Sequence, residues 1–136
     1  MRYYLDGTVI AHLLSDGQDF GALRDWMVAH EREAVTSVVA RWEATEEMSG
    51  PTQGRRSQIR EFVAGLPQVP VSGKAVEVGS YAVAAVRPYA ALHVGIAAAH
   101  EEITAVVTYD HDVATASRLY GLEVVSPGWD PDWYVA

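Results

Sequence analysis

Short apolar runs alternate along this chain with longer stretches in which apolar residues recur every three or four positions. The short runs predict buried strands, and the recurring spacing predicts amphipathic helices. The stretch ITAVVTYD at 103–110 gives the clearest strand signal, because its centre is apolar without polar alternation. In the stretch 19–31, the apolar residues from Phe20 to Met27 recur at the spacing of an amphipathic helix. Both kinds of element are therefore expected in one chain.

The predicted elements follow one another in a regular order. Strands are expected at 2–6, 34–37, 68–72, 103–110 and 122–128, and helices at 8–14, 19–31, 38–48, 52–64, 73–87, 88–102 and 111–121. Strands that alternate with helices are typical of a largely parallel sheet covered on both faces. The sequence predicts one α/β domain over residues 1–136, built as a three-layer α/β/α sandwich.

Two carboxylates end the first and fourth predicted strands. Asp6 follows RYYL and Asp110 follows ITAVVTY, so both are expected at the carboxyl edge of the sheet, where α/β proteins build their sites. Each could instead simply cap the helix that follows it. Glu43 is the third candidate. It follows Trp42 in the helix 38–48, at the rim of a face whose Val38, Val39 and Trp42 are expected in the core, and a surface charge is the alternative.

Carboxylates that converge on one cleft need a cation to stay ionised together. Ligation by oxygen alone suits Mg²⁺ or Mn²⁺, which can activate water and stabilise charge at a phosphodiester. Asp112 could add a weaker ligand, although we favour its interpretation as an acid in the first helical turn. His93 lies in an apolar helix and is expected to be a hydrogen-bonded core residue.

Composition narrows the function classes. The net charge of −8 argues against broad adhesion to nucleic acid, and the absence of cysteine excludes disulfides and thiolate metal sites and fits a cytoplasmic protein. Arg55, Arg56 and Arg60 nevertheless cluster in GRRSQIR, which could face an RNA phosphate or be a solvated helix face. No phosphate-binding glycine loop and no nucleophile-elbow motif occurs.

The motifs together resemble those of PIN-domain proteins, in particular the VapC-type ribonuclease toxins of bacterial toxin–antitoxin systems. The resemblance spans nearly the whole chain and rests on YYLDGTVI, TSVVARWEA, ALHVGIAAAH and VVTYDHDVATASRLYGLEVVSPG. It implies a PIN fold and a Mg²⁺-dependent endoribonuclease that cuts structured RNA, either tRNA or rRNA. It also implies a cognate VapB-type antitoxin that occludes the site, and a homodimer.

The resemblance assigns Asp6, Glu43 and Asp110 to family acids that hold the metal, and Thr8 to a hydroxyl that orients one of them. One acid is missing. The family's late helix usually begins Asp-Ala-Leu-His, whereas here Ala90 stands in the first of these positions. The resemblance therefore implies a weakened or inactive nuclease. Ala90 is either natural or an engineered change of Asp to Ala, and we favour the second.

Two other functions compete with the nuclease. A PIN fold kept only for binding an antitoxin or RNA is supported by Ala90. A haloacid dehalogenase-like phosphatase is suggested by Asp6-Gly7-Thr8, which matches the end of its Asp-x-Asp-Gly-Thr motif. The nucleophile of that motif would fall at Tyr4, which cannot form an aspartyl-phosphate, so the phosphatase is the more remote alternative.

Overall fold

Four parallel strands form the centre of the protein in a computed structural model that describes residues 1–15, 20–48 and 52–135. Their order across the sheet is β2–β1–β3–β4, so the first strand of the chain lies in the interior. The strands are β1 (Arg2–Leu5), β2 (Ala34–Val35), β3 (Ile103–Val107) and β4 (Glu123–Val125).

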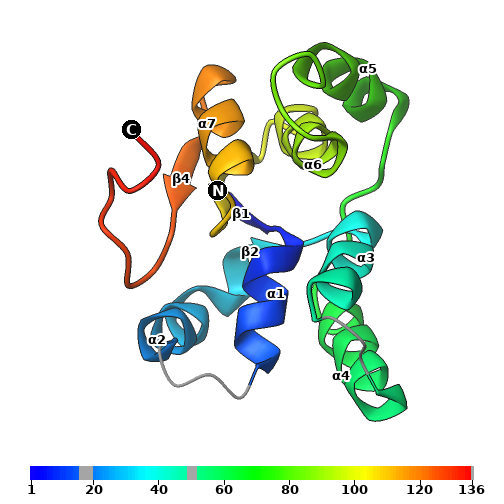
Figure 1. The fold of residues 1–136 in the computed structure, drawn as a ribbon, viewed down its shortest axis with the longest axis vertical. Coiled ribbons are helices and arrows are strands. Elements are labelled where there is room, and N and C mark those ends of the chain that lie inside the picture. The colour runs from blue at the N-terminus through cyan, green and yellow to red at the C-terminus, as the bar shows by residue number, and fades with distance from the viewer. Residues whose placement is uncertain (16–19, 49–51, 136) are drawn as a thin grey trace.

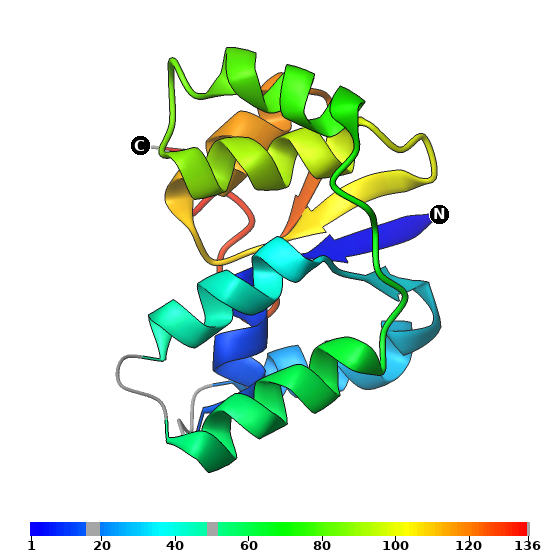
Figure 2. The same cartoon turned by 90° about the vertical axis from the view of Figure 1, so that its right-hand side faces the viewer.

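Helices cover both faces of this sheet (Figures 1 and 2). One layer contains α1 (Gly7–Leu14), α2 (Gly21–His30), the short 3₁₀ helix η1 (Glu31–Glu33), α3 (Val38–Glu47) and α4 (Gln53–Ala64). The other contains α5 (Gly73–Ala82), α6 (Pro88–Ala98) and α7 (His111–Leu119). The predicted three-layer α/β/α architecture is confirmed. No helix in the described ranges has the length and apolarity to cross a membrane.

Side-chain caps fix where the helices begin. The side chains of Asp6, Ser37, Thr52, Ser72 and Asp110 each accept a hydrogen bond from a backbone N–H in the first turn of the following helix. Such caps satisfy donors that have no partner inside the helix. The cap residues in the sequence therefore set the point at which the chain turns from strand to helix.

Several predicted elements are shorter than expected. β3 ends at Val107, so Asp110 lies in the connection to α7 and not in the strand. The segment 68–72 forms no strand: Gln68 makes one isolated bridge to Thr36, and Pro70 has no N–H to continue a ladder. α5 ends five residues before 87, and α6 ends at Ala98. Residue 19, the expected start of one helix, lies outside the described residues.

The orientation of α3 corrects one expectation. Val39, Ala40, Glu43 and Ala44 form its buried face, while Trp42 is 53% exposed. α3 packs against α1, α4 and α6, and its two buried alanines permit close approach. Trp42 lies off this stripe, so the helix turns Glu43 inward and Trp42 toward solvent.

The closest helix packing joins α5 and α6. A Cβ added at Gly95 of α6 would lie 2.2 Å from the carbonyl oxygen of Ala75 and 2.9 Å from the backbone nitrogen of Gly79. Backbone atoms cannot yield as a flexible side chain can. The contact therefore requires glycine, and it fixes α6, which carries His93 and Ala90, against its neighbour.

Gly95→Ala is expected to lower the free energy of unfolding by about 1–3 kcal/mol, because the new methyl group forces α5 and α6 apart. Chemical denaturation measures it. Gly54→Ala is the matched control, since a Cβ there would meet only the Thr52 hydroxyl at 3.8 Å. The control should raise stability by up to about 1 kcal/mol. Equal effects of both substitutions would contradict this account of the α5–α6 contact.

Candidate active site

Asp6 lies at the carboxyl end of β1, is fully buried and caps α1. Its Oδ1 accepts hydrogen bonds from the backbone N–H of Thr8 at 3.0 Å and of Val9 at 3.2 Å, and from the Thr8 hydroxyl at 2.6 Å. The helix-cap interpretation is thus correct for Asp6. It does not exclude the site interpretation, because the same carboxylate lies at the edge of the sheet where the other acids converge.

Two threonine hydroxyls join the ends of β1 and β3 around this carboxylate. Thr108 donates its hydroxyl proton to Asp6 Oδ2 and accepts from the N–H of Asp110 at 2.9 Å. Thr8 Oγ1 accepts from the N–H of Tyr109 at 3.0 Å. The expected contact of Thr8 with an acid is present. Thr108 was given no role from the sequence, although it lies in the stretch VVTYDHDVATASRLYGLEVVSPG on which the family resemblance rests.

Glu43 is also buried, so its interpretation as a surface charge is wrong. Its Oε1 accepts from the N–H of Gly7 at 2.8 Å and from Nε2 of His93 at 2.9 Å. His93 Nδ1 lies 2.7 Å from the Tyr4 hydroxyl, which lies 2.7 Å from the Ser37 hydroxyl. The expected hydrogen-bonded core role of His93 is confirmed, and this buried network fixes the position of Glu43.

Gly7 is required by the approach of Glu43. A Cβ at position 7 would lie 2.5 Å from the Cβ of Glu43 and 2.6 Å from its Oε1. The Asp-Gly-Thr sequence therefore has a structural reason here that is unrelated to phosphoryl transfer. Tyr4, the residue at the phosphatase nucleophile position, is fully buried, and its hydroxyl is engaged in the network described above.

Burial and mutual repulsion shape the charges of this centre. Burial, followed by the negative charge of Glu43, raises the pKa of Asp6 to about 6. Burial opposes protonation of His93, but its hydrogen bond to Glu43 and the charges of Glu43 and Asp6 outweigh that effect and raise its pKa. The fold thus retains two adjacent carboxylates at a cost, a pattern found frequently at functional sites.

A cleft of about 310 Å³ opens beside these groups. It is lined by Glu43, Glu46, Glu47, Arg87, Tyr89 and Asp110. Burial and the charges of Glu43 and Asp110 raise the pKa of Glu47. The cleft therefore exposes a strongly negative surface at the carboxyl edge of the sheet.

Arg87, which sequence reasoning missed, is the one basic residue among the described residues that line this cleft. Its guanidinium pairs with Asp110 through Nη2, and its Nε donates to Asp112 Oδ2 at 3.0 Å. These bonds raise the pKa of Arg87, and they lower the pKa of Asp112 despite its partial burial. Asp110 Oδ1 meanwhile caps α7. Asp112 lies in the first turn of α7 and is held by Arg87.

The remaining predicted residues lie in three places. Ala90 is fully buried on α6, three residues before His93 and therefore on the same helix face, in a cluster with Tyr4. Arg55 donates to the carbonyl of Leu14 and to Gln58. Arg56 and Arg60 line a separate pocket between α3 and α4. The three arginines therefore do not form one strip.

The donor atoms do not fit a divalent cation as they lie. Within residues 1–15, 20–48 and 52–135, no group of three acidic or histidine side chains is placed to hold a metal ion. Both oxygens of Asp6 accept hydrogen bonds, Glu43 Oε1 accepts two, and Asp110 Oδ2 is paired with Arg87. Carboxylate oxygens are the right kind of ligand for Mg²⁺. Position 90, where the family resemblance implies a further carboxylate, carries only the methyl group of Ala90.

The raised pKa of Asp6 predicts a pH dependence of stability in metal-free buffer. Between about pH 4 and 6 the folded chain holds a proton on Asp6 that the unfolded chain has released, so stability falls as pH rises through this window. Relative to Asp6→Asn, which keeps the cap without titrating, the parent chain should lose about 3 kcal/mol of unfolding free energy. Denaturation at several pH values measures the difference, and parallel profiles would contradict it.

Comparison with known proteins agrees with this geometry. No family model matches the sequence. Ribonuclease VapC47 of Mycobacterium tuberculosis (strain CDC 1551 / Oshkosh) is 31% identical over 134 residues, which cover 92% of this chain and 96% of that protein. The similarity extends over essentially the whole of both chains and agrees with the parallel sheet between two helical layers. The chain belongs to the VapC family of PIN-type ribonuclease toxins.

Proposed function

We propose that this protein is an endoribonuclease of the VapC type whose cleft lacks one carboxylate, at Ala90, and which is therefore weakened or inactive. Its substrate would be a structured RNA, tRNA or rRNA. The observation that carries the proposal is the convergence of Asp6, Glu43 and Asp110 from β1, α3 and the β3–α7 connection at one edge of the sheet. The carboxylates of Asp6 and Glu43 lie close enough to repel each other, which lowers the stability of the fold. Their retention side by side supports a shared role in one site.

Membership of the VapC family implies a divalent metal ion, which we propose is Mg²⁺ or Mn²⁺. In an intact site such an ion stabilises charge at the phosphodiester. The parent chain has only three of the expected acids, and Arg87 already neutralises one of them. In this account Thr8 and Thr108 orient the Asp6 carboxylate, while His93 and the Gly7 N–H orient Glu43.

Ala90 explains the proposed loss of activity in electrostatic terms. It shares a helix face with His93, whose Nε2 contacts Glu43, so a carboxylate at position 90 would add negative charge beside Glu43. Without that charge the cleft would attract a dication less strongly and would offer it one carboxylate fewer. Positioned charge accounts for most of the rate enhancement in phosphodiester cleavage, so the missing ligand is a large loss.

The family also implies a VapB-type antitoxin as partner. We propose that this antitoxin lays an apolar segment along α1 and α2, where Val28 is 79% exposed, and places a basic side chain at the acidic cleft. The pairing of Arg87 with Asp110 supports the second part, because it demonstrates that a guanidinium fits there. A homodimer and a cytoplasmic location remain predictions.

A non-catalytic interaction module is the second candidate function. It is favoured by the complete burial of Ala90 in an apolar cluster, together with the pairing of Arg87 with Asp110 in the cleft. In that case the acids would serve only to bind a basic segment of a partner. The two functions make opposite predictions for a chain in which the carboxylate is restored.

Ala90→Asp is expected to produce Mg²⁺-dependent cleavage of RNA, measured by gel electrophoresis of bacterial tRNA and rRNA. The restored carboxylate would complete the ligand set and raise activity at least about a hundredfold over the parent, because removal of one charge-stabilising group typically costs that much. Adding Asp6→Asn or Asp110→Asn to Ala90→Asp should abolish the gain. Absence of cleavage by a folded Ala90→Asp variant that binds metal would favour the interaction module.

Metal binding by the same variant is tested separately through its thermal unfolding. In EDTA, Ala90→Asp should lower the free energy of unfolding by about 1–3 kcal/mol, because it buries a charge without a partner. Excess Mn²⁺ should restore about 2.7 kcal/mol at a hundred times the dissociation constant. Ala90→Asn is the control with the same shape, destabilised but not rescued by metal. Equal rescue of both variants would contradict a site at this position.

A further inference from the structure

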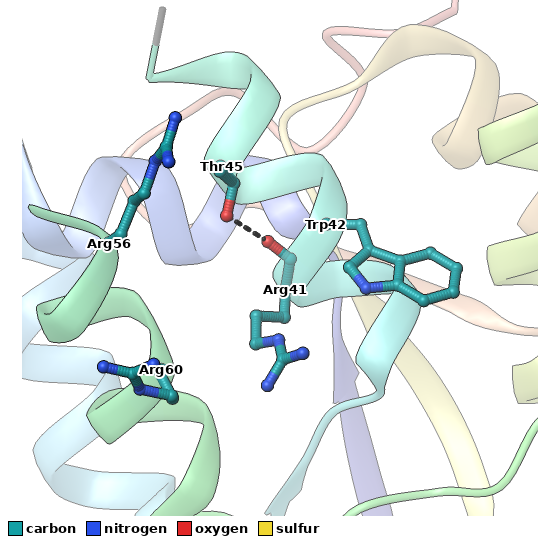
Figure 3. A pocket seen from close by; sticks show the side chains of 5 residues that line it. All are labelled: Arg41, Trp42, Thr45, Arg56 and Arg60. Carbon is teal, nitrogen blue, oxygen red and sulfur yellow. Dashed lines mark hydrogen bonds between the residues drawn. The ribbon is translucent and has the colours of Figure 1, made fainter. Parts of the chain in front are cut away.

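A second pocket lies between α3 and α4 and is distinct from the acidic cleft. It has a volume of about 380 Å³ and is lined by Arg41, Trp42, Thr45, Arg56 and Arg60. Arg41 projects from α3, and Arg56 and Arg60 project from α4, with Arg60 across from Arg41 and Arg56 nearer Thr45 (Figure 3). The Thr45 hydroxyl donates to the Arg41 carbonyl at 2.9 Å. Of these residues, Arg41 and Thr45 received no role from the sequence, and Trp42 was expected in the core.

The charge of this pocket is not balanced within the described part of the chain. Arg41, Arg56 and Arg60 have no carboxylate within ion-pair distance among the described residues, and Arg60 has only the Ser57 hydroxyl at 3.3 Å. The protein as a whole carries a net charge of −8 with only ten basic side chains. Gathering three of those ten without a counter-charge is unfavourable in the free protein and favours an anionic ligand.

Trp42 gives the pocket a second chemical property. Trp42 is 53% exposed, and its indole lies on the side of Arg41 away from α4 (Figure 3). An exposed tryptophan beside arginines offers a flat surface for stacking next to planar donors for phosphate. An acidic peptide would use the arginines but would leave the indole without a matching group. A nucleotide uses both, so the observations favour a nucleic-acid strand.

The position of α3 connects the pocket to the acidic cleft. Glu43, Glu46 and Glu47 of this helix line the cleft, while Arg41, Trp42 and Thr45 line the pocket. The two sites are therefore separated by the width of one helix, about 10 Å with its side chains. A strand of RNA that passes through the cleft needs only a short extension over α3 to reach the arginines.

We propose that this pocket binds a single-stranded segment of the RNA substrate adjacent to the bond in the cleft. Arg41, Arg56 and Arg60 contact its phosphates, and Trp42 stacks on one base. This inference rests on the proposed ribonuclease function and deepens it by assigning a substrate-binding site outside the acidic cleft. It also explains how a protein of net charge −8 holds a polyanion: the contact is local and lies opposite to the acids on the same helix.

The test measures binding and not cleavage, with a short fluorescein-labelled oligouridylate in EDTA. The triple variant Arg41→Gln, Arg56→Gln and Arg60→Gln should weaken binding at least about tenfold at low salt. It should also reduce the slope of log K against log salt by about 2, at about 0.7 per lost phosphate contact. Trp42→Ala should weaken binding roughly tenfold or more, whereas Trp42→Phe should retain most of the affinity.

The control removes the same charge from three exposed basic residues elsewhere, in Arg32→Gln, Lys74→Gln and Arg118→Gln. It should change the salt slope by much less. The proposal is overturned if both triple variants weaken binding equally, if the parent does not bind the oligouridylate, or if pocket substitutions weaken binding of the antitoxin and leave RNA binding unchanged.

Failure of this proposal is distinguishable from failure of the ribonuclease function. If the pocket variants bind RNA like the parent while Ala90→Asp cleaves RNA, the pocket assignment is wrong and the nuclease assignment stands. If the pocket variants lose RNA binding while Ala90→Asp cleaves nothing, the pocket assignment stands and the nuclease assignment is wrong.

Discussion

The carboxylate of Asp6 accepts hydrogen bonds from groups that belong to two strand ends at once. Thr8 and Val9 follow β1, Thr108 follows β3, and each contributes a donor to one fully buried side chain. These bonds start α1 and fix the connection in which Asp110 lies. They also place Asp6 beside Glu43, whose own position depends on the Gly7 N–H and His93. The acid that organises the edge of the sheet is therefore the acid around which the site is built.

Charge balance is the second constraint. The cleft gathers acids from α3 and from the β3–α7 connection, and among the described residues that line it the cationic group is Arg87, which is paired with Asp110. Ala90 removes one negative charge from the pattern that the family resemblance implies, and with it part of the attraction for a dication. On its opposite side α3 presents Arg41, which lines a pocket with Arg56 and Arg60 of α4, and none of the three has a carboxylate partner in the described structure. One helix thus separates the acidic cleft, the proposed site of cleavage, from the arginine pocket proposed to bind RNA.

The sequence predicted the fold well because apolar runs and cap residues are local signals. Asp6 and Asp110 were singled out as candidate site residues from their positions after apolar strands, and the structure shows that both are helix caps. Glu43 was found, but Trp42 was wrongly expected in the core, because the rotation of α3 is set by packing against three other helices. Arg87 and Thr108 were missed, since their partners lie 23 and 102 residues away in the sequence and no local pattern announces such contacts.

The central claim is that the acids at the edge of the sheet form a metal centre that lacks one ligand. A crystal structure of the Ala90→Asp variant grown with Mn²⁺, with anomalous diffraction to locate the ion, tests it most directly. The account predicts an anomalous peak for a Mn²⁺ ion that is coordinated by oxygens of Asp6, Glu43, Asp110 and the new carboxylate. It also predicts that Arg87 no longer pairs with Asp110. A folded variant with no peak at this edge, and with Arg87 still paired to Asp110, would contradict it.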